Sequence, residues 1–126
     1  MEQKNKKKIL VVDDEQDIVT LIKRRLEISG YEVIEAADGS EGLEKARKEK
    51  PDLVILDIML PKIDGFQVCR MLKFDTDFKD IPVMLFSARA GEHDRATGQE
   101  AGADAYLVKP FDSGALLAQV KQLLKD

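Results

Sequence analysis

The segment Leu53-Val54-Ile55-Leu56 is a run of four apolar residues, and the acid Asp57 follows it directly. Two other runs, at residues 9–12 and 83–86, have the same apolar character. A strand that is apolar at consecutive positions is buried on both faces, as are the central strands of a parallel sheet between two layers of helices. These three runs therefore predict the middle of a parallel sheet that is covered on both sides.

Further strands and helices extend this pattern in both directions along the chain. Residues 31–36 and 105–108 predict two more strands, and the mixed composition of the first is typical of a sheet edge. Helical periodicity separates the strands, most clearly at about residues 15–29, where apolar residues recur every fourth position from Ile18 to Leu26. Strict alternation of strand and helix predicts a doubly wound α/β fold, with any ligand at the carboxyl ends of the strands.

The other helices differ in how firmly they should be held. Asp38 is placed to start the second helix, a third spans roughly residues 66–73, and Asp112 is placed to cap the fifth. The segment 91–102 is apolar mainly through alanines, so a helix there would be held weakly against the sheet. We expect this fourth helix to be the moving part of the fold.

Length and charge limit the classes of function. The 126 residues suit one domain, and a net charge of -4 argues against nucleic acid as a partner. Only four apolar residues separate the N-terminal lysines from Asp13, too few for a signal peptide or a membrane span. The single cysteine, Cys69, suits a reducing compartment. We expect a cytoplasmic protein with a flexible basic N-terminus, residues 1–7, and one domain, residues 8–126, that ends with the fifth helix.

Polar residues of an unusual kind follow the predicted strands. They are Asp13 and Asp14 after the first, Asp57 after the third, Ser87 after the fourth and Lys109 after the fifth. Three carboxylates that meet at one edge of a sheet repel one another unless a cation lies among them. Oxygen ligands of this kind suit Mg²⁺ better than a metal that prefers cysteine or histidine. The sequence therefore predicts a magnesium site at this edge.

A carboxylate beside Mg²⁺ is able to attack phosphorus and form an aspartyl phosphate. Asp57 is the best candidate nucleophile, while Lys109 and the hydroxyl of Ser87 are suited to stabilise the phosphoryl oxygens. Taken singly, each residue also has an ordinary structural role: Asp14 as a helix N-cap, Asp57 as a turn residue, and the other two as solvated or satisfied polar groups. Their joint placement favours the functional interpretation.

Four segments resemble signatures of the receiver domain of two-component response regulators, and the resemblance extends from Lys8 to Leu124. They are residues 9–15 (ILVVDDE), residues 53–61 followed by Asp64-Gly65, the pair Ser87-Ala88, and Lys109-Pro110-Phe111. The resemblance implies a flavodoxin-like fold: a five-stranded parallel sheet of order 2-1-3-4-5 with five helices on both faces. It also implies a bacterial phosphoprotein of signal transduction that is not an enzyme, except that it catalyses phosphoryl transfer to, and hydrolysis from, its own aspartate.

The resemblance further implies particular roles at the site. Asp57 would accept a phosphoryl group from a histidine kinase or a histidine phosphotransferase. Asp13 and Asp14 would hold Mg²⁺ together with Asp57 and the backbone carbonyl of Met59. Lys109 would contact the phosphoryl group. These roles agree with those inferred from the residue types themselves.

A conformational switch is implied as well. Ser87, with the backbone of Ala88, would contact the phosphoryl group, and Ser87 would move toward it. The ring of Tyr106 would turn inward and repack the face made by the fourth helix, fifth strand and fifth helix. This face would control a downstream protein target. We expect a monomer, and whether phosphorylation drives dimerisation stays open at this point.

Two finer expectations concern residues beside the site. Met59 and Arg89 each lie two positions past a site residue, where their side chains would alter the access of hydrolytic water to the phosphoryl group. The family usually has a cis peptide at the position of Lys109-Pro110, which would aim the lysine into the site.

Three other functions compete with this interpretation. A magnesium-dependent phosphohydrolase would need a cap domain and a second acid two residues beyond Asp57, where Met59 stands. A flavodoxin-like cofactor protein would need Gly, Ser and Thr, rather than Asp13 and Asp14, after the first strand. A phosphorylation-independent interaction module would keep the fold, but its acids would more often be incomplete. The intact set of acids favours the phospho-acceptor.

Overall fold

The protein folds as one five-stranded parallel sheet covered by helices, in a computed structural model that describes residues 6–88, 91–110 and 112–125. The strands are β1 (Lys8–Val12), β2 (Glu32–Ala36), β3 (Leu53–Asp57), β4 (Val83–Ser87) and β5 (Ala105–Val108). The helices are α1 (Gln16–Ile28), α2 (Gly39–Glu49), α3 (Gly65–Lys73), α4 (Glu92–Glu100) and α5 (Ser113–Leu124). The strand order is β2-β1-β3-β4-β5, which confirms the predicted fold.

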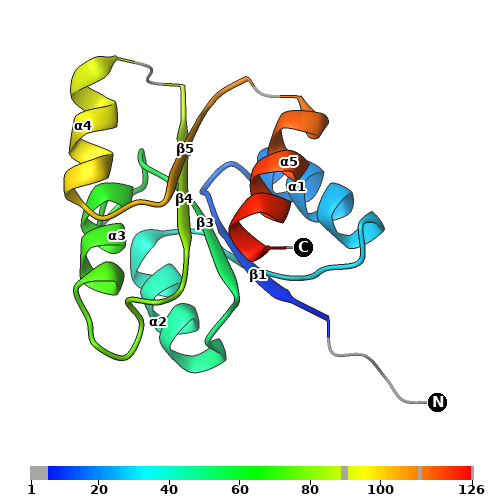
Figure 1. The fold of residues 1–126 in the computed structure, drawn as a ribbon, viewed down its shortest axis with the longest axis horizontal. Coiled ribbons are helices and arrows are strands. Elements are labelled where there is room, and N and C mark those ends of the chain that lie inside the picture. The colour runs from blue at the N-terminus through cyan, green and yellow to red at the C-terminus, as the bar shows by residue number, and fades with distance from the viewer. Residues whose placement is uncertain (1–5, 89–90, 111, 126) are drawn as a thin grey trace.

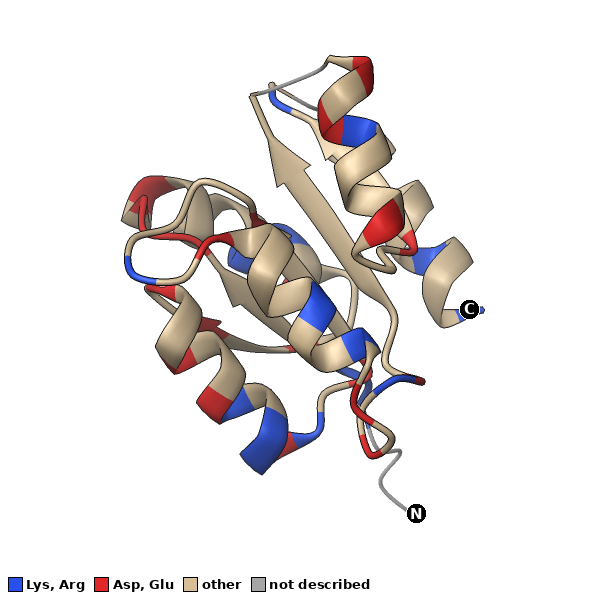
Figure 2. Ribbon diagram, turned by 90° about the vertical axis from the view of Figure 1, so that its left-hand side faces the viewer, with Lys and Arg blue, Asp and Glu red and all other residues tan. Residues whose placement is uncertain are grey.

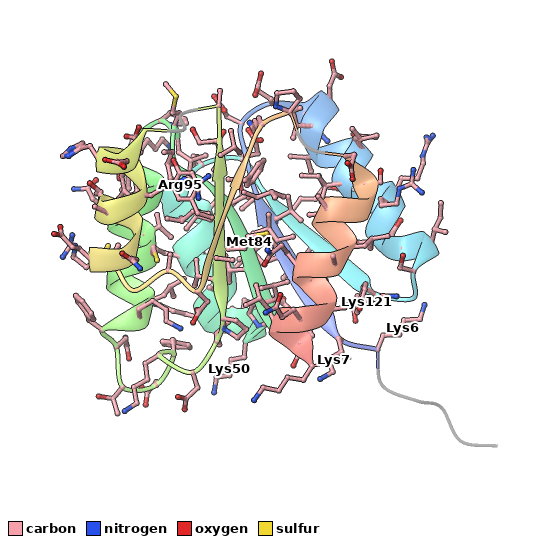
Figure 3. All side chains as sticks on the ribbon, turned by 45° about the horizontal axis from the view of Figure 1, so that its top comes forward. Lys6, Lys7, Lys50, Met84, Arg95 and Lys121 are labelled. Atoms are coloured by element: carbon pink, nitrogen blue, oxygen red, sulfur yellow. The ribbon has the colours of Figure 1, made fainter. Side chains whose placement is uncertain are left out.

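Two layers of helices cover the two faces of the sheet (Figure 1). Helices α1 and α5 lie on one face, and α2, α3 and α4 lie on the other. Successive strand residues point to opposite faces, so β4 sends Leu85 into the core of the second layer and Met84 and Phe86 into the core of the first. Figure 3 shows Met84 in the interior of the molecule. This alternation explains why the central strands are apolar at every position.

Local sequence fixes where the helices begin. The carboxylates of Asp38, Asp64 and Asp112 each accept a backbone N–H of the first turn, at α2, α3 and α5 respectively. Basic residues close the last turns of α2 and α3, where they face the negative end of the helix dipole (Figure 2). Helix α1 differs, because its N-cap is Glu15 and no side chain caps it. Asp14 is therefore not the N-cap, so its ordinary structural alternative is excluded.

Helix α4 makes the sparest contact with the sheet, in line with its predicted weak hold. Its buried residues are Asp94 and Gly98, and a Cβ atom at Gly98 would lie 3.2 Å from Leu85 and 3.3 Å from Tyr106. The helix therefore approaches the sheet closely without inserting a large apolar side chain. The Arg95 guanidinium of α4 lies over the Tyr106 ring of β5, 5.3 Å from the ring centroid.

The C-terminal end of α4 is tied to α3 at the amino edge of the sheet. The buried thiol of Cys69 donates to the carbonyl of Ala101 at 3.5 Å. Farther along, Lys73 Nζ lies 2.9 Å from Asp104 Oδ2, and the same oxygen accepts the backbone N–H of Val83 at 2.8 Å. Gly102 has φ of +90° and packs against Lys73. These contacts join the turn after α4 to α3 and to the start of β4.

No helix among the described residues is long and apolar enough to cross a membrane.

Candidate functional site

A cavity of about 330 Å³ opens at the carboxyl edge of the sheet, between the ends of β1, β3, β4 and β5. Its lining residues are Asp14, Glu15, Asp57, Met59, Ser87, Ala88 and Lys109. The parallel sheet explains this assembly, because the carboxyl ends of all its strands meet at one edge. The structure thus brings together residues from distant parts of the chain, as their positions after the strands predicted.

Three carboxylates converge at this cavity. Asp13, Asp14 and Asp57 each offer an oxygen, and these oxygens lie within 4.8 Å of one another. Asp13 and Asp57 are 2% and 3% exposed, whereas Asp14 is exposed. Asp13 accepts the backbone N–H of Glu15 at 2.9 Å, and Asp57 accepts that of Met59 at 3.1 Å. Each buried carboxylate is thus oriented by the backbone two residues after it.

The ammonium group of Lys109 lies among the acids. Its Nζ atom is 3.3 Å from Asp13 Oδ2, 3.3 Å from Glu15 Oε1 and 3.4 Å from Asp57 Oδ2. The side chain is 16% exposed. On another side, the Nζ atom lies 4.7 Å from the centroid of the Phe86 ring. The lysine is therefore held by both charge and an aromatic face.

Burial and mutual repulsion shape the charges at the site. Desolvation raises the pKa of Asp13 to about 6, and the charge of Asp57 adds to the rise, while the Glu15 backbone N–H and Lys109 oppose it. Burial by itself lowers the pKa of Lys109, but the charges of Asp57 and Asp13 outweigh it, so that pKa is raised. The lysine is charged at neutral pH, and the paired acids retain a net negative charge that attracts a cation.

Backbone contacts fix the segments that carry these side chains. The Lys109 N–H donates to the Ser87 carbonyl at 2.7 Å, and the Ile58 N–H donates to the Phe86 carbonyl at 3.3 Å. The Lys109–Pro110 peptide bond is cis. At the start of α3, a Cβ atom on Gly65 would overlap the Asp57 carbonyl oxygen. Only glycine permits this close approach, so the sequence Asp64-Gly65 both caps α3 and seats it against the site.

The remaining predicted site residues lie in different surroundings. Ser87 is buried at the end of β4, and Ala88 is exposed at the cavity. Met59 is 59% exposed beside the acids. Tyr106 does not line this cavity and instead lines another of about 400 Å³ between α4 and β5. Arg89 lies outside the residues that the structure describes, so its expected position beside the site stays a prediction.

Sequence reasoning gave no role to two residues that contact Lys109. Glu15 was visible only as the residue after the two acids, and its side chain reaches Lys109 from the start of α1. In the sequence, Phe86 is simply one residue of the apolar run at 83–86. Alternation along β4 predicts that Phe86 lies on the face opposite Leu85. Its contact with Lys109 depends on how the ends of β4 and β5 pack, and no sequence pattern reveals that packing.

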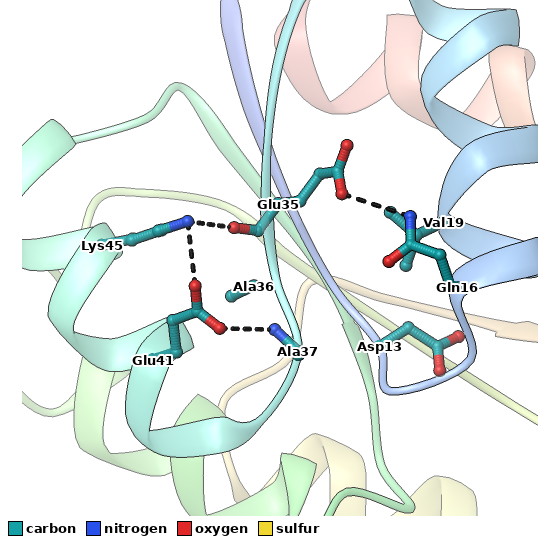
Figure 4. A pocket seen from close by; sticks show the side chains of 8 residues that line it. All are labelled: Asp13, Gln16, Val19, Glu35, Ala36, Ala37, Glu41 and Lys45. Carbon is teal, nitrogen blue, oxygen red and sulfur yellow. Dashed lines mark hydrogen bonds and ion pairs between the residues drawn. The ribbon is translucent and has the colours of Figure 1, made fainter.

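A second cavity, of about 250 Å³, adjoins the site on the side of β2 (Figure 4). Its polar side chains are engaged with one another. Lys45 contacts Glu41 at 3.0 Å and donates to the Glu35 carbonyl at 2.6 Å, and Gln16 donates to the Glu35 carboxylate at 3.4 Å. This network joins α1 and α2 to β2, and Asp13 is the one lining residue shared with the acid cluster.

Fold and site together define a doubly wound α/β domain with a cation-attracting acidic cavity at its carboxyl edge. The family model of the response regulator receiver domain matches residues 9–121, and the chain belongs to this family.

Solved structures and curated sequences agree with this assignment. A CheY-like receiver domain protein from Methanospirillum hungatei JF-1 has a TM-score of 0.90 and 33% identity, with 96% of this chain and 95% of that chain covered. Chemotaxis protein CheY4 of Vibrio cholerae has a TM-score of 0.89 and 32% identity, with 94% and 99% covered. The alkaline phosphatase synthesis transcriptional regulatory protein PhoP of Bacillus subtilis is 50% identical over 119 residues, which are 94% of this chain and 49% of PhoP.

The chain spans about half the length of the curated relatives that it matches. Several of these relatives are named as transcriptional regulators, and a Synechocystis relative is named as DNA-binding. The matched half is the receiver domain. The prediction that these 126 residues do not bind nucleic acid therefore concerns the receiver domain alone, and it stays a prediction.

Proposed function

We propose that this receiver domain is a phospho-acceptor in a two-component signalling system and that Asp57 carries the phosphoryl group. The observation that supports this most directly is the convergence of three carboxylates on Lys109 in one cavity, with Asp57 almost fully buried. Such a site combines a nucleophile, a place for a cation and a fixed positive charge. A purely structural cluster would have little reason to keep two buried acids in mutual repulsion.

The residues fit Mg²⁺. The oxygens of Asp13, Asp14 and Asp57 lie close enough to share one ion, and oxygen ligands suit it. We assign these three side chains and the backbone carbonyl of Met59 as its ligands. When bound, the ion would neutralise part of the negative charge on the phosphoryl oxygens. The pKa of Asp13 is raised mainly by burial of its carboxylate and further by the charge of Asp57, and a bound cation would offset both effects.

In the transfer step, a carboxylate oxygen of Asp57 attacks the phosphorus of a phosphohistidine on a histidine kinase or a histidine phosphotransferase. The new P–O bond forms as the P–N bond breaks, and the imidazole nitrogen keeps the electron pair. Lys109, now 3.4 Å from Asp57, stabilises the charge on the phosphoryl oxygens, and the Ser87 hydroxyl and the Ala88 backbone N–H donate to them. Hydrolysis of the aspartyl phosphate later restores Asp57.

Phosphorylation would shift the population of two conformations. Ser87 moves toward the phosphoryl group, and the Tyr106 ring turns inward to the space that Ser87 leaves. The ring now lies under the guanidinium of Arg95, so this movement would break a contact between α4 and β5. The face made by α4, β5 and α5 would then bind or release a downstream protein target.

Residues at the rim would set the lifetime of the phosphoryl group. Met59 is largely exposed beside the acids, where its side chain overhangs the path of an attacking water molecule. We assign Arg89 the same role from its position two residues after Ser87. Replacement of both by small polar residues is expected to change the rate of dephosphorylation, and an unchanged rate would exclude this role.

The direct test is intact mass spectrometry after incubation with acetyl phosphate, with and without Mg²⁺. Asp57→Asn removes the nucleophile at nearly constant shape. Asp52→Asn is a matched control, because Asp52 lies at the opposite end of the same strand, where it accepts the Lys8 N–H. We expect a magnesium-dependent phosphoryl adduct in the wild type and in Asp52→Asn, and none in Asp57→Asn.

Other outcomes would point elsewhere. If the wild type acquires no adduct under conditions that label a known receiver domain, the phospho-acceptor role is excluded and a phosphorylation-independent interaction module is favoured. Binding by the unphosphorylated protein would then be tested. An adduct that persists in Asp57→Asn would place the acceptor at another residue.

A further inference from the structure

Phe86 contacts the functional site as well as the core. It is the penultimate residue of β4, pairs in register with Asp57 of β3, and is fully buried. Its ring also lies beside the ammonium of Lys109, with 4.7 Å between Nζ and the ring centroid. The ring therefore lies at the inner side of the site, next to the ammonium group of Lys109, which faces Asp57.

A ring face attracts an ammonium group without forming a hydrogen bond to it. Lys109 has three N–H donors, and its Nζ atom lies 3.3 Å from Asp13 and Glu15 and 3.4 Å from Asp57. An aromatic neighbour therefore stabilises the charge while it leaves these donors available for carboxylate or phosphoryl oxygens. A polar neighbour in the place of Phe86 would occupy one of them.

The three acids around Lys109 pull it in different directions. The carboxylates of Asp13 and Asp57 are 0% and 5% exposed, whereas that of Glu15 is 63% exposed. Glu15 therefore favours an outer position of the ammonium, near solvent, and the buried ring of Phe86 favours an inner one. Only the inner position serves phosphoryl transfer at Asp57, because negative charge develops there in the transition state.

We propose that Phe86 is a positioning residue for phosphoryl transfer: its ring holds the ammonium of Lys109 at Asp57 against the outward pull of Glu15. The proposal rests on the proposed function of Asp57 and names a residue that tunes its rate. A weaker ring would leave the ammonium with Glu15 for a larger share of the time and would slow phosphorylation.

The test replaces Phe86 with phenylalanine analogues that carry one, two or three ring fluorines, introduced at this position alone. Fluorine withdraws electrons from the ring face and changes its size only slightly, so the series weakens the attraction stepwise. The rate constant of labelling by acetyl phosphate is measured at saturating Mg²⁺, with thermal unfolding as a check of stability. The same analogues at Phe78, a buried residue of the other core layer, are the matched control.

We expect the labelling rate to fall with each fluorine at position 86, by about three- to tenfold over the series, which corresponds to about 0.7–1.4 kcal/mol. At position 78 the rate should stay constant. In a Glu15→Gln background the fall should shrink, because the outward pull is gone. A ring that serves only to fill the core would give equal falls in both backgrounds, and that result would overturn the proposal.

The outcomes separate this proposal from the function on which it rests. Absence of any magnesium-dependent adduct in the wild type would exclude the phospho-acceptor role itself. If the wild type is labelled normally and the labelling rate does not change with the number of fluorines at position 86, only the role of Phe86 is excluded. If the fluorinated proteins do not fold, NMR of the wild type decides: the Lys109 Hε protons should be shifted upfield by the ring relative to Phe86→Leu, and unshifted protons would overturn the proposal.

Discussion

Replacement of Gly65 by alanine should disturb the site through the backbone alone. The added methyl group would overlap the Asp57 carbonyl oxygen and would lie 2.5 Å from the Cα atom of Ile58. Carbon atoms in contact are normally about 3.5–4.0 Å apart, so α3 or the segment after β3 must move by about 1 Å. The neighbouring atoms belong to the backbone of a buried strand end, which leaves no flexible side chain to absorb this movement.

The expected magnitudes follow from this displacement. Overpacking of this kind costs about 1–3 kcal/mol, which for a domain of this size lowers Tm by roughly 5–15 °C. A shift of about 1 Å at a reacting group slows a reaction by up to roughly a hundredfold. Circular dichroism melts measure the first effect, and the rate of labelling of Asp57 by acetyl phosphate measures the second.

Gly42→Ala is the matched control within α2. There the three atoms nearest to the new methyl group would all belong to the Val12 side chain, the nearest at 3.1 Å, and alanine favours the helix by roughly 1 kcal/mol. We expect this variant to melt close to the wild type and to be labelled normally. If Gly65→Ala behaved in the same way on both measures, the inference that the close approach of α3 fixes the geometry of the site would be wrong.

Three further predictions address charge, reactivity and the amino edge of the sheet. The pKa of Asp13 is raised from 3.8 to about 6, so its contribution to stability is present below pH 3.8 and is lost as the pH rises through about 6. Mg²⁺ should therefore raise Tm more at pH 7 than at pH 5, and equal shifts would contradict this charge assignment. Burial raises the pKa of the Cys69 thiol to about 12, so iodoacetamide at pH 8 should modify it only after denaturation, as mass spectrometry will reveal. Asp104→Ala removes the acceptor of the Val83 N–H and should lower the free energy of unfolding, measured in urea, by about 1–3 kcal/mol. Asp104→Asn keeps an acceptor and should lower it less.

The strands and helix caps were predictable from the sequence. A strand that is buried on both faces needs apolar residues at consecutive positions, which the sequence shows directly. Residues 53–57 are all buried, and the continuous apolar run at residues 53–56 predicts a central strand. Caps were equally visible, since Asp38 and Asp112 bond to the backbone three residues away. These features depend on neighbours in the chain or on one property of the surroundings, so one sequence is sufficient to predict them.

The candidate site was predictable in its membership but not in its packing. Parallel topology alone brings Asp13, Asp57 and Lys109 to one edge. The contacts of Lys109 with Glu15 and Phe86 depend on side-chain rotamers and on the relative height of two strand ends. Sequence periodicity carries no information on either. The N-cap of α1 was also unpredictable, because Asp13, and not the residue next to the helix, accepts the nearby N–H.

The contacts at the C-terminal end of α4 determine how that helix is able to move. The Cys69 thiol and the Lys73–Asp104 pair anchor the turn after it to α3, far from the acidic cavity. The opposite end of α4 begins at Glu92, five positions after Ser87 in the sequence. If α4 moves in the proposed switch, a helix anchored in this way would rotate about its anchored end. With nine residues it is roughly 13 Å long, so each 10° of rotation moves the end near the cavity by about 2 Å. In the proposed switch, this anchor would make the end of α4 that follows Ser87 in the sequence move farther than the anchored end.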